Sequence, residues 1–115
     1  MKLMFYRERS IYMNFNLNYE GFEEYLLKRT VLDDHRKGVQ YLFKFPNRYG
    51  ASVIKHRCSY GYEDDLWELG VIRFGTDGEV WRLTYDTEIT DDVIGFITDE
   101  RVRELLGRIK DLECN

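Results

Sequence analysis

The sequence predicts an α+β fold, a four-stranded antiparallel meander with an N-terminal and a C-terminal helix packed on one face. Three observations predict this α-β4-α arrangement. A helical pattern precedes four alternating segments, short turns join those segments, and a second helical pattern closes the chain. Parallel strands would need crossovers of a dozen or more residues, so short turns favour antiparallel pairing. The 115 residues, 16% of them aromatic, suffice for one packed core.

The first twelve residues show neither a helical nor a strand period. Purine-rich codons for Arg9 and Ser10 would place a ribosome-binding sequence just upstream of the Met13 codon. Residues 1–12 are therefore expected to be either a translated upstream leader or a flexible arm. Residues 13–115 are expected to form a single α+β domain.

The N-terminal part of that domain predicts a helix. Phe15 and Leu17 alternate with asparagines as in a short edge strand, and Asn18 then caps a helix over 18–29. Residues 30–38 are a polar connection. The helix stripe expected to face the core consists of Phe22, Tyr25, Leu26 and Arg29.

Four alternating segments follow, and alternation assigns their side chains to faces. The first turn is a hairpin loop in which Gly50 is available for a positive φ. A bulge near Gly70 would reconcile the mismatched alternation of the third segment. The strands are expected over 39–45, 51–58, 66–74 and 79–85, and the helix-covered face carries Tyr41, Phe43, Phe45, Trp67, Trp81 and Tyr85.

The C-terminal part contains two similar strings, each with a threonine followed by acidic residues. Thr90 and Thr98 each predict a helix N-cap with acids in the first turn. The first predicts one short turn that ends near Gly95, and the second predicts a full helix to Leu112. Its core-facing stripe consists of Val102, Leu105, Leu106, Ile109 and Leu112.

Motifs and composition argue against most catalytic classes. The chain has no phosphate loop, dinucleotide fingerprint, nucleophile elbow or zinc-protease motif. His56 and Cys58 share a strand face, but zinc needs at least one more protein ligand, and His35 lies in a mixed-charge loop. We therefore expect no enzyme, metal or cofactor.

Composition also narrows the partners and the compartment. The net charge of −4 argues against nucleic-acid binding. No apolar run approaches the roughly 20 residues of a membrane span. The two cysteines, Cys58 and Cys114, form no recognisable pair and favour a reducing compartment such as the cytoplasm.

Charge is distributed unevenly along the chain. Residues 1–58 contain 11 Lys and Arg against 6 Asp and Glu, whereas residues 59–115 contain 6 against 15. In a meander, the start of the third strand and the end of the fourth lie at one end of the sheet, so two acidic groups should meet beside a Tyr-Gly-Tyr loop. Such loops suit protein interfaces, and a solvated acidic rim is the alternative. The expected partner-binding residues are Tyr60, Tyr62, Glu63, Asp64, Asp65, Asp86, Asp91 and Asp92.

Three segments of the chain resemble small accessory proteins encoded by phages and prophages of Gram-positive bacteria. They are FPNRYGASVIKH (residues 45–56), DLWELGVIRF (65–74) and LTYDTEITDDVIGFITDERVRELL (83–106). The resemblance covers more than half of the chain and carries no assigned activity, so no functional residue follows from it. It implies a non-enzymatic protein that binds a protein partner, such as a host or defence factor, in the bacterial cytoplasm. A self-associating structural or virion component is the alternative, and a small metal-dependent enzyme is the third class.

Overall fold

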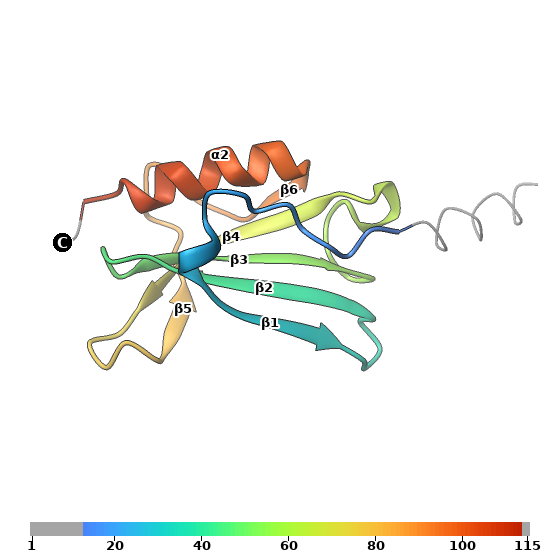
Figure 1. The fold of residues 1–115 in the computed structure, drawn as a ribbon, viewed down its shortest axis with the longest axis horizontal. Coiled ribbons are helices and arrows are strands. Elements are labelled where there is room, and N and C mark those ends of the chain that lie inside the picture. Colours follow the sequence, from blue (N-terminus) through green and yellow to red (C-terminus); the bar gives the residue numbers. More distant parts are fainter. Residues whose placement is uncertain (1–12, 114–115) are drawn as a thin grey trace, which may run out of the picture.

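The computed structural model describes residues 13–113, so the expectations for residues 1–12 and for Cys114 lie outside the described part. Within that part, an antiparallel sheet of six strands is covered on one face by one α-helix (Figure 1). In chain order the elements are η1 (Glu23–Tyr25), β1 (Leu26–Leu32), β2 (Gly38–Lys44), β3 (Tyr49–His56), η2 (Tyr62–Asp64), β4 (Trp67–Phe74), β5 (Trp81–Leu83), β6 (Ile94–Ile97) and α2 (Asp99–Lys110).

The first four strands form a meander, and β5 and β6 share the remaining edge of β4. β5 pairs with the end of β4, with Trp81 opposite Phe74. β6 pairs with the beginning of β4, with Ile97 opposite Trp67. The predicted four-stranded sheet with two helices is therefore wrong, because strands lie where an N-terminal helix and a short helical turn were expected.

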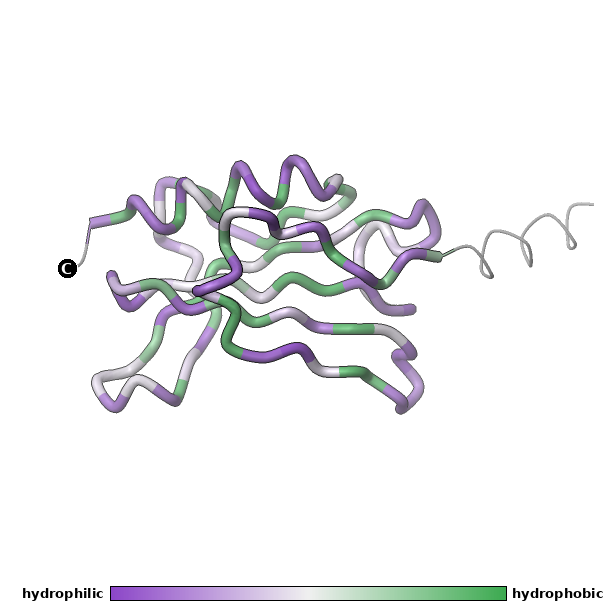
Figure 2. Tube along the Cα trace, viewed as in Figure 1, coloured by the Kyte–Doolittle hydropathy of each residue, from purple (hydrophilic) through white to green (hydrophobic). Residues whose placement is uncertain are grey.

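The predicted N-terminal helix over 18–29 is replaced by the single turn η1 and the strand β1. Gly21 has a φ of 93°, which interrupts any helix at this point. The following Thr30 and Val31 are β-branched, and they favour the strand that pairs with β2. Figure 2 shows that β1 is apolar at both ends and polar in its middle, a pattern of neither simple period.

The N-terminal residues nevertheless cover the sheet as an extended segment. Phe15, Leu17 and Tyr19 turn inward and alternate with exposed asparagines, but residues 13–19 are assigned to no strand. The Tyr41 hydroxyl donates to the Phe15 carbonyl at 3.0 Å and accepts from the Leu17 amide at 3.1 Å. The expected edge strand is therefore wrong, although the expected alternation is correct.

The C-terminal helix is confirmed in position and in its buried stripe. The Thr98 side chain caps α2 by accepting a hydrogen bond from the Arg101 amide at 3.2 Å. Four apolar residues of α2 are completely buried against β3 and β4: Val102, Leu105, Leu106 and Ile109. At Thr90, by contrast, the side chain accepts from the Asp92 amide in a local turn, and β6 follows instead of a helical turn. None of the helices within residues 13–113 is long and apolar enough to span a membrane.

The two sheet faces are buried by different groups. Tyr41, Phe43, Phe45 and Trp67 join the main core beneath α2, as expected. Trp81 was assigned to that face but packs on the opposite one, and Tyr85 is 50% exposed. The smaller cluster beneath Trp81 consists of Leu42, Ile72 and Phe74.

Two expectations about glycines are also wrong. The residue with positive φ in the β2–β3 turn is Arg48, at 72°, whereas Gly50 lies within β3. A side chain at Gly50 would place its Cβ 2.0 Å from the Phe43 carbonyl oxygen. The pairing of β3 with β4 continues through Gly70 without a bulge, and the irregularity in β4 lies instead in its pairing with β6, between Trp67 and Leu69. A Cβ at Gly70 would lie 2.6 Å from Cδ2 of Leu83, so this glycine makes room for that side chain.

Candidate functional site

The acidic and tyrosine residues expected to form a partner surface are divided among several places. Asp65 precedes β4, whereas Asp86 lines a groove that also contains Arg73 and Phe74, at the opposite end of that strand. Asp91 and Asp92 precede β6, which runs toward the beginning of β4. Asp91 and Asp92 therefore lie before the far end of β6, on the side away from Asp65. The expected meeting of the two acidic groups at one end of the sheet does not occur.

The tyrosines of the loop before β4 have separate environments. Tyr60 is 62% exposed, and its amide donates to the Glu68 carboxylate at 2.9 Å. The Tyr62 ring stacks on Phe15, with 6.4 Å between ring centroids. Glu63 and Asp64 form the acidic part of η2 beside them. A binding role for these residues stays a prediction.

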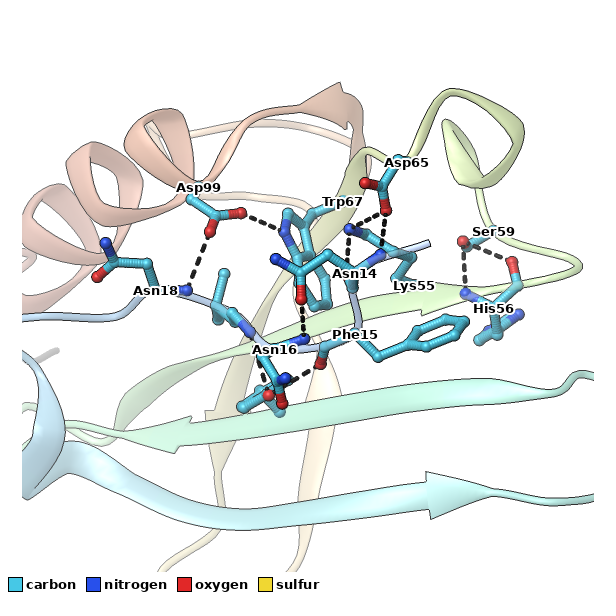
Figure 3. A network of polar contacts seen from close by, with 12 residues as sticks. Asn14, Phe15, Asn16, Asn18, Lys55, His56, Ser59, Asp65, Trp67 and Asp99 are labelled. Atoms are coloured by element: carbon cyan, nitrogen blue, oxygen red, sulfur yellow. Dashed lines mark hydrogen bonds and ion pairs between the residues drawn. The ribbon is translucent and has the colours of Figure 1, made fainter. Parts of the chain in front are cut away.

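Lys55 organises the polar network near the beginning of β4. Only 2% of this residue is exposed, although lysines are rarely buried. Its Nζ donates to the Asn14 carbonyl at 2.6 Å and to Oδ1 of Asp65 at 2.8 Å (Figure 3). The ammonium also lies 4.2 Å from the centroid of the Trp67 ring, a favourable cation–π contact. The buried charge is thus compensated on several sides, as its burial requires.

The same network continues to the helix through Asp99, in the first turn of α2. One carboxylate oxygen accepts from Nε1 of Trp67 at 2.6 Å, and the other accepts from the Asn18 amide at 3.0 Å (Figure 3). Arg103 donates to the Asn18 carbonyl at 2.9 Å. Because these groups satisfy one another, the network fastens the N-terminal segment to sheet and helix. Its geometry indicates a structural role.

A groove of about 580 Å³ lies at the other end of β4 and is lined by three arginines. Arg73 of β4 and Arg82 of β5 are directly opposite each other, and Tyr49 of β3 is opposite Arg73 on its other side. Opposed residues share a sheet face. The Arg73 guanidinium carbon lies 4.9 Å from the centroid of the Tyr49 ring. This row places two cations side by side on one face of the sheet.

Arg48 is the third arginine and comes from the β2–β3 turn. Phe74 fixes it in place: the Phe74 amide donates to the Arg48 carbonyl at 2.8 Å, and Nη2 of Arg48 donates to the Phe74 carbonyl at 3.3 Å. The Nε of Arg48 is buried without a hydrogen-bond partner. Such a donor costs about 1–3 kcal/mol, and a left-handed non-glycine residue costs about 1–2 kcal/mol. Two unfavourable features therefore coincide at one residue of the groove.

Asp86 is the one acidic residue among the described residues that line this groove. It accepts a hydrogen bond from the Thr84 hydroxyl at 2.6 Å. Three guanidinium groups against one carboxylate leave an excess of positive charge, in a chain whose net charge is −4. Guanidinium groups bind carboxylate and phosphate oxygens in bidentate geometry. The groove is therefore chemically suited to hold an oxyanion.

Sequence reasoning missed these arginines, because the expected strands over 66–74 and 79–85 leave a turn of residues 75–78 that would place Arg73 opposite Val80. In the structure the connection is residues 75–80, and Arg73 and Arg82 lie at equal distances from its centre. A hairpin brings such residues opposite each other. The contribution of Arg48 had no signal in the sequence, because it depends on how the β2–β3 turn packs against the end of β4.

The remaining titratable groups do not assemble a catalytic or metal site within residues 13–113. No group of three or more His, Cys, Asp or Glu side chains is arranged there to hold a metal ion. His56 accepts a hydrogen bond from the Cys58 amide at its Nδ1, and burial lowers the pKa of this histidine. Cys58 is exposed and lies beyond the end of β3. Arg36 donates to Asp34 and holds the pKa of that carboxyl well below its usual range.

No protein-family model, curated protein or solved structure matches this chain. The resemblance to phage and prophage proteins therefore stays a prediction.

Proposed function

We propose that this protein is a non-catalytic binding protein whose arginine groove, formed by Arg48, Arg73 and Arg82, holds an oxyanion of a protein partner. The observation that carries the proposal is the direct opposition of Arg73 and Arg82 on neighbouring strands. Together with Arg48 they line one groove and offer it several guanidinium N–H donors. A bound carboxylate or phosphate would accept paired hydrogen bonds from such groups.

The construction of the groove favours binding over catalysis. Guanidinium groups are unsuited to general acid or base catalysis, because they do not exchange a proton readily in proteins. Asp86 and Thr84 already hydrogen-bond to each other. The groove therefore offers charge and geometry for recognition, and Asp86 disfavours ligands that fill the groove with excess negative charge.

Titration of the ¹⁵N-labelled protein with two probes tests the proposal. Inorganic phosphate and a tri-glutamate peptide represent the two sources of an oxyanion. We expect saturable shifts of the arginine Nε–H signals in the groove with at least one probe. Phosphate alone would indicate a phosphorylated partner, and the peptide alone would indicate an acidic one.

Variants localise the binding. Arg82→Gln removes one exposed cation of the groove, and Arg108→Gln removes an exposed cation of α2 and serves as the matched control. We expect the first to weaken binding at least about tenfold, as loss of a charged hydrogen bond does, and the second to leave it unchanged. No saturable shifts with either probe, or equal losses in both variants, would refute the proposal.

A further inference from the structure

The strand β1 is the outer strand of the sheet and pairs only with β2 among the described residues. It lies at the edge away from α2 in Figure 1, and no other element runs along its outer side there. An outer strand presents unpaired backbone amides and carbonyls, which another extended chain can pair with. Its seven residues match the length of an ordinary strand.

An apolar pocket adjoins this strand on the helix-covered face of the sheet. Its volume is about 390 Å³, and it lies between Val31 and Val39 on the sheet and Phe15 and Tyr62 above them. Val31 is 65% exposed, although most valines of this sheet are buried. A chain added to β1 would place alternate side chains on the face of Val31. Those side chains would reach this pocket.

The surroundings of the pocket are mainly cationic. Arg29 and Lys37 line it, and Asp33 is its one acidic lining residue among the described residues. Lys28 lies next to Arg29 in the strand and is exposed. Figure 2 shows this polar centre of β1 between two apolar ends. The charge pattern complements an extended chain whose acidic residues are flanked by apolar ones.

We infer that β1 docks an extended segment of a partner protein, with acidic side chains beside Lys28 on one face of the sheet and apolar side chains at the pocket beside Val31 on the other face. Backbone pairing supplies the affinity in this mode, and the pocket and the charges supply the specificity. This inference does not depend on the arginine groove. The two sites lie at different strands and share no lining residue.

A second copy of this chain is a poorer occupant of the same edge. Two antiparallel β1 strands that overlap along most of their length place Lys28 and Arg29 of one copy close to those of the other. Opposed like charges in neighbouring strands are destabilising, and lysines on outer strands protect against such self-pairing. The charges therefore select an acidic partner against a second copy.

Fluorescence polarisation with two labelled peptides tests the inference. Ser-Val-Glu-Val-Glu-Val-Ser is the probe, and Ser-Val-Lys-Val-Lys-Val-Ser is its charge-reversed control. We expect the acidic peptide to bind at least about tenfold more tightly, because the lysine peptide brings like charges together. Amide hydrogen exchange of the full chain should slow in β1 when the acidic peptide is bound, and not in β5 or β6.

Two variants separate the edge from a general charge effect. Lys28→Glu should weaken binding of the acidic peptide at least about tenfold, whereas Arg108→Glu on α2 should leave it unchanged. Equal affinity for both peptides, or slowed exchange outside β1, would overturn the inference. Sedimentation of a dimer whose β1 amides are protected without peptide would assign the edge to a second copy and overturn it as well. If Lys28→Glu abolishes peptide binding and Arg82→Gln leaves it intact, the site at β1 is separate from the arginine groove.

Discussion

Buried or half-buried cations lie near both ends of β4, but the surroundings of these cations differ. Near its beginning, Lys55 is enclosed by the Asp65 carboxylate, the Asn14 carbonyl and the Trp67 ring. Near its end, Arg73 faces Arg82, and Nε of Arg48 has no partner. A cation with a complete set of partners holds the fold together. A buried donor without a partner among the described residues, such as Nε of Arg48, costs stability, and a binding role of the groove would account for that cost.

The largest expected effect comes from removing Lys55, the cation whose partners are all in place. Lys55→Ala should lower the free energy of unfolding by about 3 kcal/mol, because it removes a buried charge pair, a hydrogen bond and the packing of the side chain. Urea unfolding monitored by tryptophan fluorescence measures the change. Arg108→Ala, at an exposed position of α2, should change it by less than about 0.5 kcal/mol. A loss below about 1 kcal/mol at Lys55 would show that the network does not hold the N-terminal segment.

The next effect should come from supplying the arginine groove with an oxyanion. Phosphate at about ten times its dissociation constant should raise the free energy of unfolding by about 1.4 kcal/mol, since a ligand that binds only the folded state stabilises it by mass action. Chloride at the same ionic strength is the control for screening. The gain should disappear in Arg82→Gln and persist in Lys55→Ala, whose network lies at the other end of β4. An equal gain in Arg82→Gln would mean that phosphate acts elsewhere.

A smaller effect of opposite sign is expected from Arg48. Arg48→Gly should raise the free energy of unfolding by about 1 kcal/mol, because glycine accepts the φ of 72° without strain and the unpartnered Nε disappears. The same variant should bind phosphate more weakly. Arg48→Ala is the matched control, since it removes the guanidinium but keeps the strained φ. A glycine variant less stable than the alanine variant would show that Arg48 is not strained.

The sequence predicted the elements around the beginning of β4 only in part. The strand over 39–45 and the stripe of α2 follow regular periods. The structure confirms both, and the strand over 66–74 as well, within one or two residues. The predicted helix over 18–29 was wrong because the spacing of its apolar residues suits an extended segment followed by a strand as well as it suits a helix. Only the pairing of β1 with β2 decides between them, and that pairing is a tertiary contact.

Neither charged site could be derived from local pattern. Lys55 joins residues 14 and 65, and its burial depends on a segment whose structure was assigned incorrectly. The acidic end was inferred from a meander in which the fourth strand runs the full length of the third. The fourth strand, β5, has three residues and covers only part of β4, so the chain after it emerges beside the arginines. Strand length and register, which alternation alone does not determine, therefore decide which charges meet.

The smallest expected effect concerns His56, a buried side chain that differs from Lys55 and from the arginines in how it carries charge. Arginine cannot release its proton in a protein, whereas histidine can. Burial, and then the positive charge of Arg36, lower the pKa of His56. The unfolded chain therefore binds a proton at this site at a higher pH than the folded chain does. The resulting stability is present above the unfolded pKa of about 6.5 and is lost as the pH falls through the folded value.

His56→Asn isolates this contribution, because the asparagine Oδ1 can accept the Cys58 amide as Nδ1 does. We expect the stability difference between wild type and variant to fall when the pH is lowered from 7.5 to 5.5, measured by urea unfolding at both pH values. A difference independent of pH would mean that His56 titrates normally. If the difference does fall, the protein carries its cations in three ways: Lys55 keeps its charge with partners, His56 gives up its charge, and the arginines, under the proposed function, keep theirs for a ligand.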